Sequence, residues 1–202
     1  MSSPTAPTAT NRLGVRDLAT IGIFTALLFV LSIVTGTVTS LHPMVYLFNP
    51  ALLALLGAVF YAIIVTRVQK RGAAFLTATI FGVAWGVLGG WPLTVLMLIA
   101  GVFGEVVLAR GGAAKLSRIT GAWIAFTLAN YGGVFGAAMF AADSFRASGE
   151  GIGQDPGYIN DVISAAQSQL ALVALGVMVA LAVVVMLFAR RMLRKHFSPG
   201  QA

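Results

Sequence analysis

The sequence predicts an all-α integral membrane protein, a bundle of six transmembrane helices with both termini in the cytoplasm. Apolar residues make up 58% of the 202-residue chain and charged residues only 9%, whereas a soluble domain is about one quarter charged. The apolar residues gather in runs close to the ~20 residues that a helix needs to cross a bilayer. Lysine and arginine gather between these runs on one side, and such residues are retained on the cytoplasmic side of a membrane.

Six spans follow from the apolar runs and from the turn residues between them. The predicted spans are 18–36, 45–66, 73–89, 91–109, 119–142 and 169–189. The fourth span is the clearest, because it begins at Trp91 and is followed by Arg110 and Lys115, as at the two interfaces of a spanning helix. The third span is short, and the connection Gly89-Gly90 is so tight that the third and fourth spans are expected to form a hairpin.

The charge distribution fixes the predicted orientation. Of the 13 lysines and arginines, only Arg146 falls in a connection on the outer side. Residues 1–16 are predicted to be a disordered cytoplasmic N-terminus, residues 17–190 the substrate-binding bundle, and residues 191–202 a basic cytoplasmic tail. The net charge of +7 therefore indicates a cytoplasmic membrane face and not a nucleic-acid-binding surface.

The outer side consists of three connections. The first, 37–44, carries His42, and the second is the glycine hairpin. The third, 143–168, is long and acidic, and a connection of this length is usually functional or disordered. Within it we expect a short helix over 158–168, separated from the preceding loop by Pro156-Gly157.

Polar and aromatic residues in the outer half of the bundle are the candidate substrate ligands. Pockets for small molecules are mainly apolar and aromatic, with a few placed polar groups. The candidates are Tyr46, Asn49, Trp85, Trp91, Asn130, Tyr131, Arg146, Tyr158, Gln167 and, next to it, Gln169. For Asn49 and Asn130 the alternative is hydrogen bonding between helices, since an unpaired polar group in hydrocarbon is unfavourable.

Small residues on the first span form a candidate partner-docking face. Ala19, Gly22 and Ala26 lie on one side of the helix, and small residues at this spacing let a second helix approach closely. Packing inside the bundle and docking of another membrane subunit are both open from the sequence. The third span repeats the pattern at Gly82 and Gly86, and the fourth carries Gly101 and Gly104.

The remaining ionisable residues do not form a catalytic or metal-binding set. Glu105 is the one acid inside a span, and we expect it to pair with Arg110 or Lys115, with proton coupling as the alternative. We interpret His42 as an exposed loop histidine, with ligation of a haem iron as the alternative. No metal-ligand cluster, hydrolase motif or P-loop lysine motif occurs, so we expect no cofactor and no enzymatic activity.

The segment VRDLATIGIFTALLFVLSIV, residues 15–34, resembles the first helix of the substrate-binding S components of energy-coupling factor (ECF) transporters. The whole chain is most similar to the Trep_Strep, or MptD-like, S components. The resemblance rests on the basic second connection, the glycine-rich hairpin, the pair Gly101 and Glu105, and the tail ARRMLRKHF, and it covers residues 15–197.

The resemblance implies a plasma-membrane subunit of an ABC-type importer, in a bacterium or archaeon. It would capture a vitamin or other micronutrient from outside and deliver it by reorienting against a T subunit, driven by two cytoplasmic ATPases. The face of Ala19, Gly22 and Ala26 would contact the T subunit. A vitamin, a purine-like precursor and a tetrapyrrole such as haem all remain open as the substrate. The alternatives are a stand-alone secondary transporter or small channel, and a membrane enzyme subunit.

Overall fold

The computed structural model describes residues 12–109 and 115–196 (189–196 as backbone only), and this part of the chain is helical without any strand. The long helices are α1 (Val15–Thr39), α3 (Asn49–Arg67), α4 (Ala73–Val87), α5 (Trp91–Ala109), α6 (Leu116–Phe140) and α9 (Gln169–His196). The short helices are α2 (Pro43–Tyr46), α7 (Ala142–Gly151) and α8 (Pro156–Ala166). The prediction of an all-α fold is confirmed. Much of the predicted basic tail and of the predicted N-terminal segment lies outside the described residues.

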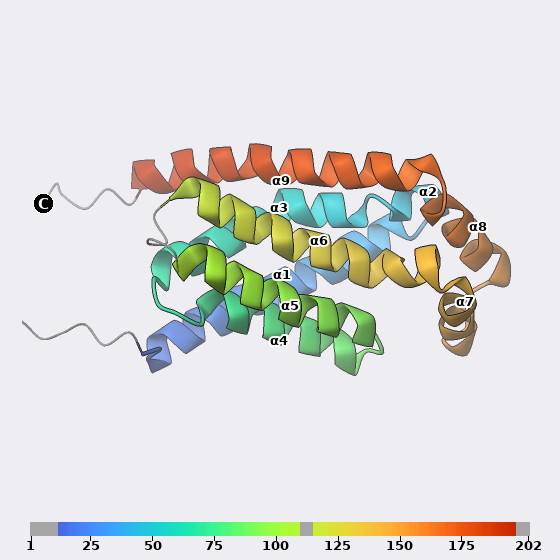
Figure 1. The fold of residues 1–202 in the computed structure, drawn as a ribbon, viewed down its shortest axis with the longest axis horizontal. Helices are drawn as coiled ribbons and strands as arrows, with labels where there is room; N and C mark the ends of the chain where they lie inside the picture. The colour runs from blue at the N-terminus through green and yellow to red at the C-terminus, as the bar shows by residue number, and fades with distance from the viewer. Residues whose placement is uncertain (1–11, 110–114, 197–202) are drawn as a thin grey trace, which may run out of the picture.

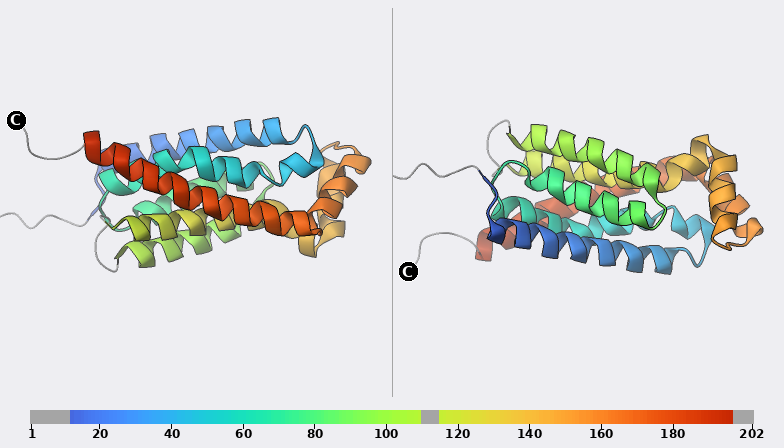
Figure 2. Two further views of the ribbon diagram at one scale, coloured as in Figure 1. Left: turned by 90° about the horizontal axis from the view of Figure 1, so that it is seen from above. Right: turned by 90° about the horizontal axis from the view of Figure 1, so that it is seen from below.

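The long helices run side by side in an elongated bundle, and α7 and α8 lie across one end of it (Figure 1). We call this the outer end; it also holds α2 and the α4–α5 turn. The start of α1, the α3–α4 connection and the end of α9 lie at the opposite, inner end. In Figure 2, α9 is nearest the viewer from above, whereas α4 and the start of α1 are nearest from below.

Five stretches of the described chain are long and apolar enough to cross a membrane. They are Val15–Thr39, Pro43–Arg67, Trp91–Ala109, Leu116–Phe140 and Gln169–Phe188. Helix α4 is apolar but has only 15 residues, fewer than the ~20 of a full crossing. The prediction of a multi-pass membrane protein is confirmed, and the crossing by α4 as a sixth span stays a prediction.

The predicted second span begins in two pieces. Pro43 stands in the first turn of α2, where the Nδ1 atom of His42 accepts a hydrogen bond from the Met44 N–H (3.3 Å). Helix α3 then begins at Asn49 with Pro50 in its first turn. Proline suits a first turn because the N–H it lacks would have no partner there. Tyr46 and Asn49 therefore lie on two different helices, although only three positions separate them.

The long outer connection differs from the prediction. It folds into two helices, and the first, α7, was expected to be loop. Pro156 and Gly157 do not precede the second helix but form the start of α8. Asp155 caps it, since its Oδ1 atom accepts a hydrogen bond from the Tyr158 N–H (2.9 Å). The prediction missed this because the proline was taken as a break and not as a first-turn residue.

Helices α4 and α5 form the predicted hairpin and pack through their glycines. Gly89 in the turn has a φ of 92°, a left-handed conformation that favours glycine. A Cβ atom on Gly82 would lie 2.8 Å from the Cβ of Met97, so the two helices touch at this point. The Thr94 hydroxyl donates a hydrogen bond to the Gly82 carbonyl across the same contact (2.7 Å). These glycines serve packing inside the chain.

Two acids join elements near the inner end. The Oε1 atom of Glu105, in α5, accepts hydrogen bonds from the N–H groups of Ala74 (2.7 Å) and Phe75 (3.1 Å) in the first turn of α4. The first N–H groups of a helix have no partner within it, and a carboxylate is favoured there. Asp17 at the start of α1 forms an ion pair with Lys70 in the α3–α4 connection (2.6 Å). Glu105 was expected to pair with Arg110 or Lys115. The contacts that the structure shows for it are with backbone amides, and they give it a structural role. Arg110 lies outside the described residues.

The centre of the bundle is a cluster of four aromatic side chains that we call the aromatic floor: Tyr61, Phe81, Trp123 and Phe126. All four are at most 2% exposed. Phe126 lies 5.0 Å from Phe81 and 5.3 Å from Trp123 between ring centroids, and Tyr61 lies 5.1 Å from Trp123. The Trp123 indole N–H donates a hydrogen bond to the Ala54 carbonyl (3.1 Å). Helices α3, α4 and α6 are held together by this floor, and the candidate site lies on its outer side.

Candidate functional site

Two buried asparagines lie on the outer side of the aromatic floor. Asn49, at the start of α3, is 8% exposed, and Asn130, in α6, is 3% exposed. The Oδ1 atom of each is buried and has no hydrogen-bond partner in the described part of the chain. The same holds for the phenol oxygen of Tyr158 in α8. Together with Tyr46, these residues form what we call the outer polar layer.

The members of the outer polar layer come from four helices that meet near the outer end. Asn130 lies one helical turn beyond Phe126, and so on the same face of α6. Asn49 faces α1, because its Nδ2 atom lies 3.7 Å from the position of a Cβ atom on Gly36. The Tyr46 ring packs edge-on against Phe135 of α6 at 5.1 Å. Helix α2, which carries Tyr46, contacts α8, which carries Tyr158.

The unpaired oxygens of this layer are energetically unfavourable. More than nine in ten buried polar groups in proteins have a partner, and a buried acceptor without one costs about 1–3 kcal/mol. The other buried side-chain atoms without a partner belong to Thr25, Thr79 and Arg118, closer to the inner end. Burial also raises the pKa of the Tyr158 phenol, so this group is a neutral hydroxyl at pH 7.

Other predicted site residues border the layer but have partners of their own. The Trp85 indole N–H donates a hydrogen bond to the Ser32 hydroxyl (3.3 Å), and its ring lies edge-on to Phe29 at 5.6 Å. The Tyr131 hydroxyl donates to the Ala171 carbonyl of α9 (2.8 Å). Trp91 lies apart, 69% exposed at the start of α5.

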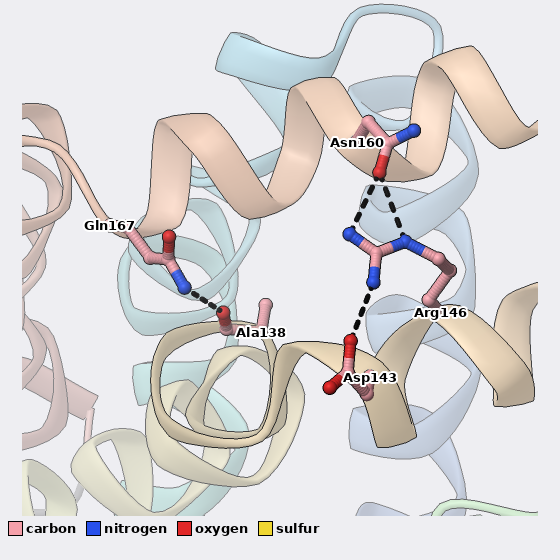
Figure 3. Close-up of polar contacts among 5 residues, drawn as sticks. All are labelled: Ala138, Asp143, Arg146, Asn160 and Gln167. Carbon is pink, nitrogen blue, oxygen red and sulfur yellow. Dashed lines mark hydrogen bonds and ion pairs between the residues drawn. The ribbon is translucent and has the colours of Figure 1, made fainter.

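Arg146 and Gln167 hold the outer helices together (Figure 3). The Arg146 guanidinium donates hydrogen bonds to Asn160 of α8 (3.0 and 3.1 Å) and to Asp143 of α7 (2.8 Å). The Gln167 amide donates to the Ala138 carbonyl of α6 (3.3 Å). Both side chains were predicted to contact substrate, and in this structure both fix α7 and α8 on the bundle.

A groove opens at the corner where α8 meets α9. Its volume is about 590 Å³, and two predicted residues, Tyr131 and Gln167, line it together with Gln169. The remaining lining residues are mainly apolar: Met139, Phe140, Ala166, Ser168, Ala171, Leu172 and Leu175. The groove lies on the α9 side of α6, because Tyr131 binds the α9 backbone there.

The small residues of α1 face away from the rest of the described chain. Ala19 and Ala26 are exposed, and a Cβ atom added to Gly22 would meet nothing within 4 Å. The neighbouring large side chains Ile23 (61% exposed) and Val30 (56% exposed) share this surface. Packing inside the bundle, one of the two explanations open from the sequence, therefore does not account for this face.

His42 does not sit in a metal-binding cluster. Its side chain is exposed, and its Nδ1 atom caps α2 as described above. Among the described residues, no three His, Cys, Asp or Glu side chains lie close enough together to hold a metal ion.

The sequence analysis did not single out Phe135 or the four residues of the aromatic floor. Phe135 is fully buried and contacts both Tyr46 (5.1 Å) and Tyr131 (5.4 Å). The sequence feature that could have identified Phe135 is its position one turn after Tyr131, since residues four apart lie on one face of a helix. Phenylalanine in an apolar span carries no polar atom, and so it does not stand out from residues that face lipid.

Comparison with known proteins identifies the family. No curated protein and no solved structure matches the chain. A family model described as a hypothetical bacterial integral membrane protein (Trep_Strep) matches residues 15–198, a range that contains all the helices given above. The prediction of this family from the sequence is confirmed. The chain belongs to the Trep_Strep family of bacterial integral membrane proteins.

Proposed function

We propose that the chain is the substrate-capture subunit, or S component, of an ECF-type importer. In this role it binds a vitamin or another micronutrient at the outer end of the bundle. It then delivers the substrate by reorienting against a T subunit, powered by two cytoplasmic ATPases. The resemblance of residues 15–34 to the first helix of such subunits, and the membership of the Trep_Strep family, support this proposal.

The observation that carries the proposal is the unfilled face of Ala19, Gly22 and Ala26 on α1. In a membrane, helices associate by close packing at small residues, because lipid tails remove the hydrophobic driving force. Nothing in the described chain occupies this face. In the proposed function, a helix of the T subunit packs against this face.

The arrangement of charges supports the direction of transport. Arg67 ends α3, and Lys70 and Arg71 lie in the connection that follows at the inner end, where α1 starts and α9 ends. By the positive-inside rule this end faces the cytoplasm of a cell membrane crossed by six spans, α4 included. The outer polar layer then faces outward, as capture of an external solute requires.

Co-purification tests the proposal. The chain is produced in its host together with T-subunit and ATPase candidates, and the complex is isolated through a tag on the chain. The double variant Gly22→Leu, Ala26→Leu fills the α1 face. Gly176→Leu is the matched control, because Gly176 of α9 is likewise a helical glycine with nothing in the described chain within 4 Å of an added Cβ.

We expect the wild type and Gly176→Leu to retain the T subunit and the double variant to lose it, with all three equally folded. Retention of the T subunit by the double variant would contradict the proposal. Uptake by the chain alone, without T subunit or ATPases, would contradict it as well, and would favour a stand-alone transporter.

A further inference from the structure

The chemistry of the outer polar layer limits what it binds. Each asparagine amide carries a carbonyl acceptor and an N–H donor side by side, and the acceptors of Asn49 and Asn130 are unpaired. An asparagine amide pairs in a bidentate manner with an edge that offers the opposite arrangement, as it does with adenine. The Tyr158 hydroxyl adds a third group that both donates and accepts. The layer is therefore complementary to a ligand rich in neutral hydrogen-bonding groups.

None of the residues of the outer polar layer carries a charge that could balance a charged ligand. The buried polar side chains of the described chain are all threonine, serine or asparagine. At the outer end, Asp143, Glu150, Asp155 and Asp161 are exposed, and Arg146 is engaged by Asp143 and Asn160. A charged group taken into this layer would lose its hydration without gaining a counter-charge, which is strongly unfavourable.

Aromatic rings lie next to the layer and favour a flat ligand. Tyr46 and Phe135 lie edge to face, and Phe126 of the aromatic floor lies one turn of α6 before Asn130. Aromatic side chains pack against flat rings by stacking and edge contacts. Next to Asn49, glycine at position 36 keeps the facing surface of α1 free of a side chain.

We propose that Asn49, Asn130 and Tyr158 bind an uncharged aromatic heterocycle through an edge that carries N–H next to C=O. This inference rests on the proposed function and names its substrate class. The unpaired oxygens are the groups that the ligand satisfies, and the empty protein is less stable because it carries them.

The first test measures the stability of the ligand-free protein. Leucine has nearly the shape of asparagine without its polar atoms, so Asn49→Leu and Asn130→Leu each remove an unpaired buried oxygen. Each is expected to raise the melting temperature by roughly 2–4 °C. Asn160→Leu is the control: Asn160 is exposed and accepts two hydrogen bonds from Arg146, so this change is not expected to raise it. A lower melting temperature for Asn49→Leu and Asn130→Leu would overturn the proposal.

The second test compares ligands by thermal shift on the isolated chain. Uracil and lumichrome are uncharged rings with the required edge, orotate adds a carboxylate to uracil, and 1,3-dimethyluracil lacks the N–H groups. We expect at least one of the first two to stabilise the wild type, and neither of the last two. Asn130→Leu and Tyr158→Phe should abolish the shift, whereas Asn160→Leu should keep it.

A shift with orotate, or no shift with either uncharged ring, would overturn the substrate class. Neither result would affect the proposed function, because binding is measured without the T subunit. Conversely, the chain could bind a neutral ring and still take up solute without the T subunit. That result would support the binding site and contradict the importer role.

Discussion

The glycines of α4 and α5 share a spacing pattern with the small residues of α1, but the two sets have opposite surroundings. A Cβ atom on Gly82 would lie 2.8 Å from Met97, and one on Gly101 would lie 3.1 Å from Ala78. Among the described residues, nothing lies within 4 Å of a Cβ atom on Gly22. The same pattern therefore closes a hairpin inside the chain in one place and leaves a surface for a second molecule in the other. Only the neighbours of a small residue distinguish these roles.

The largest expected effect on stability is at Gly82, where α4 and α5 pack closely together. Gly82→Leu forces a side chain into the backbone of α5, since Thr94 Cα lies 3.2 Å from an added Cβ. Overpacking of this kind costs about 1–3 kcal/mol or more. We expect a lower melting temperature and a reduced yield of folded protein in detergent. A melting temperature equal to that of the wild type would mean that α4 and α5 are not closely packed here.

Glu105→Ala is expected to have the next largest effect. It leaves the N–H groups of Ala74 and Phe75 without their acceptor, at a cost of about 1–3 kcal/mol. Glu105→Gln keeps an oxygen at the same place, so it should retain most of the stability and of the uptake. Thermal unfolding and uptake of both variants check this. A well-folded Glu105→Gln protein without transport would indicate a coupling role for the charge.

Thr94→Val removes the hydroxyl that joins α5 to the Gly82 carbonyl (2.7 Å). Hydrogen bonds between helices in a membrane contribute about 0.6 kcal/mol on average, so the expected loss is small but measurable. Unfolding in denaturant, with Thr37→Val as the control, measures it; the Thr37 hydroxyl bonds only its own helix. Equal losses in both variants would mean that the contact between the helices adds nothing.

The smallest effect on stability is expected at the open face. A Cβ atom at Gly22 meets nothing within 4 Å in the described part of the chain. Gly22→Leu should therefore change the free energy of unfolding by less than about 0.5 kcal/mol, apart from a gain in helix propensity. Thermal unfolding of the isolated chain provides the measurement. A loss as large as that of Gly82→Leu would show that α1 packs through this face, and the contrast between the two sets of glycines would disappear.

The sequence predicted the helices well and their contacts poorly. Long apolar runs and the Gly89-Gly90 turn located α1, α4, α5, α6 and the start of α9 to within a few residues, because bilayer length and turn geometry are local properties. Helix α7 was missed, since its sequence ADSFRASGEG is polar and contains two glycines. It is held by Arg146 and by its contact with α8, and neither interaction is visible in a local pattern.

For the candidate site, too, the sequence predicted positions better than contacts. Composition and depth identified Asn49, Asn130 and Tyr158, but whether such groups are paired depends on side chains of other helices. Tyr131 and Trp85 have partners, whereas the two asparagine oxygens do not. Glu105 was expected to meet Arg110 or Lys115; Arg110 lies outside the described residues, and the contact that the structure shows is with backbone amides of α4. That contact depends on the register of the α4–α5 hairpin, which the sequence does not specify.

The most direct test of the open face uses the absence of cysteine from the chain. A single cysteine is placed at Gly22 or, as the control, at Gly176, and it is labelled with a photoactivatable benzophenone maleimide in membranes that contain the T subunit. Illumination of the Gly22→Cys protein should give a covalent product with the T subunit, and that of Gly176→Cys should not. A product from Gly176→Cys alone, or from neither protein, would contradict docking through α1.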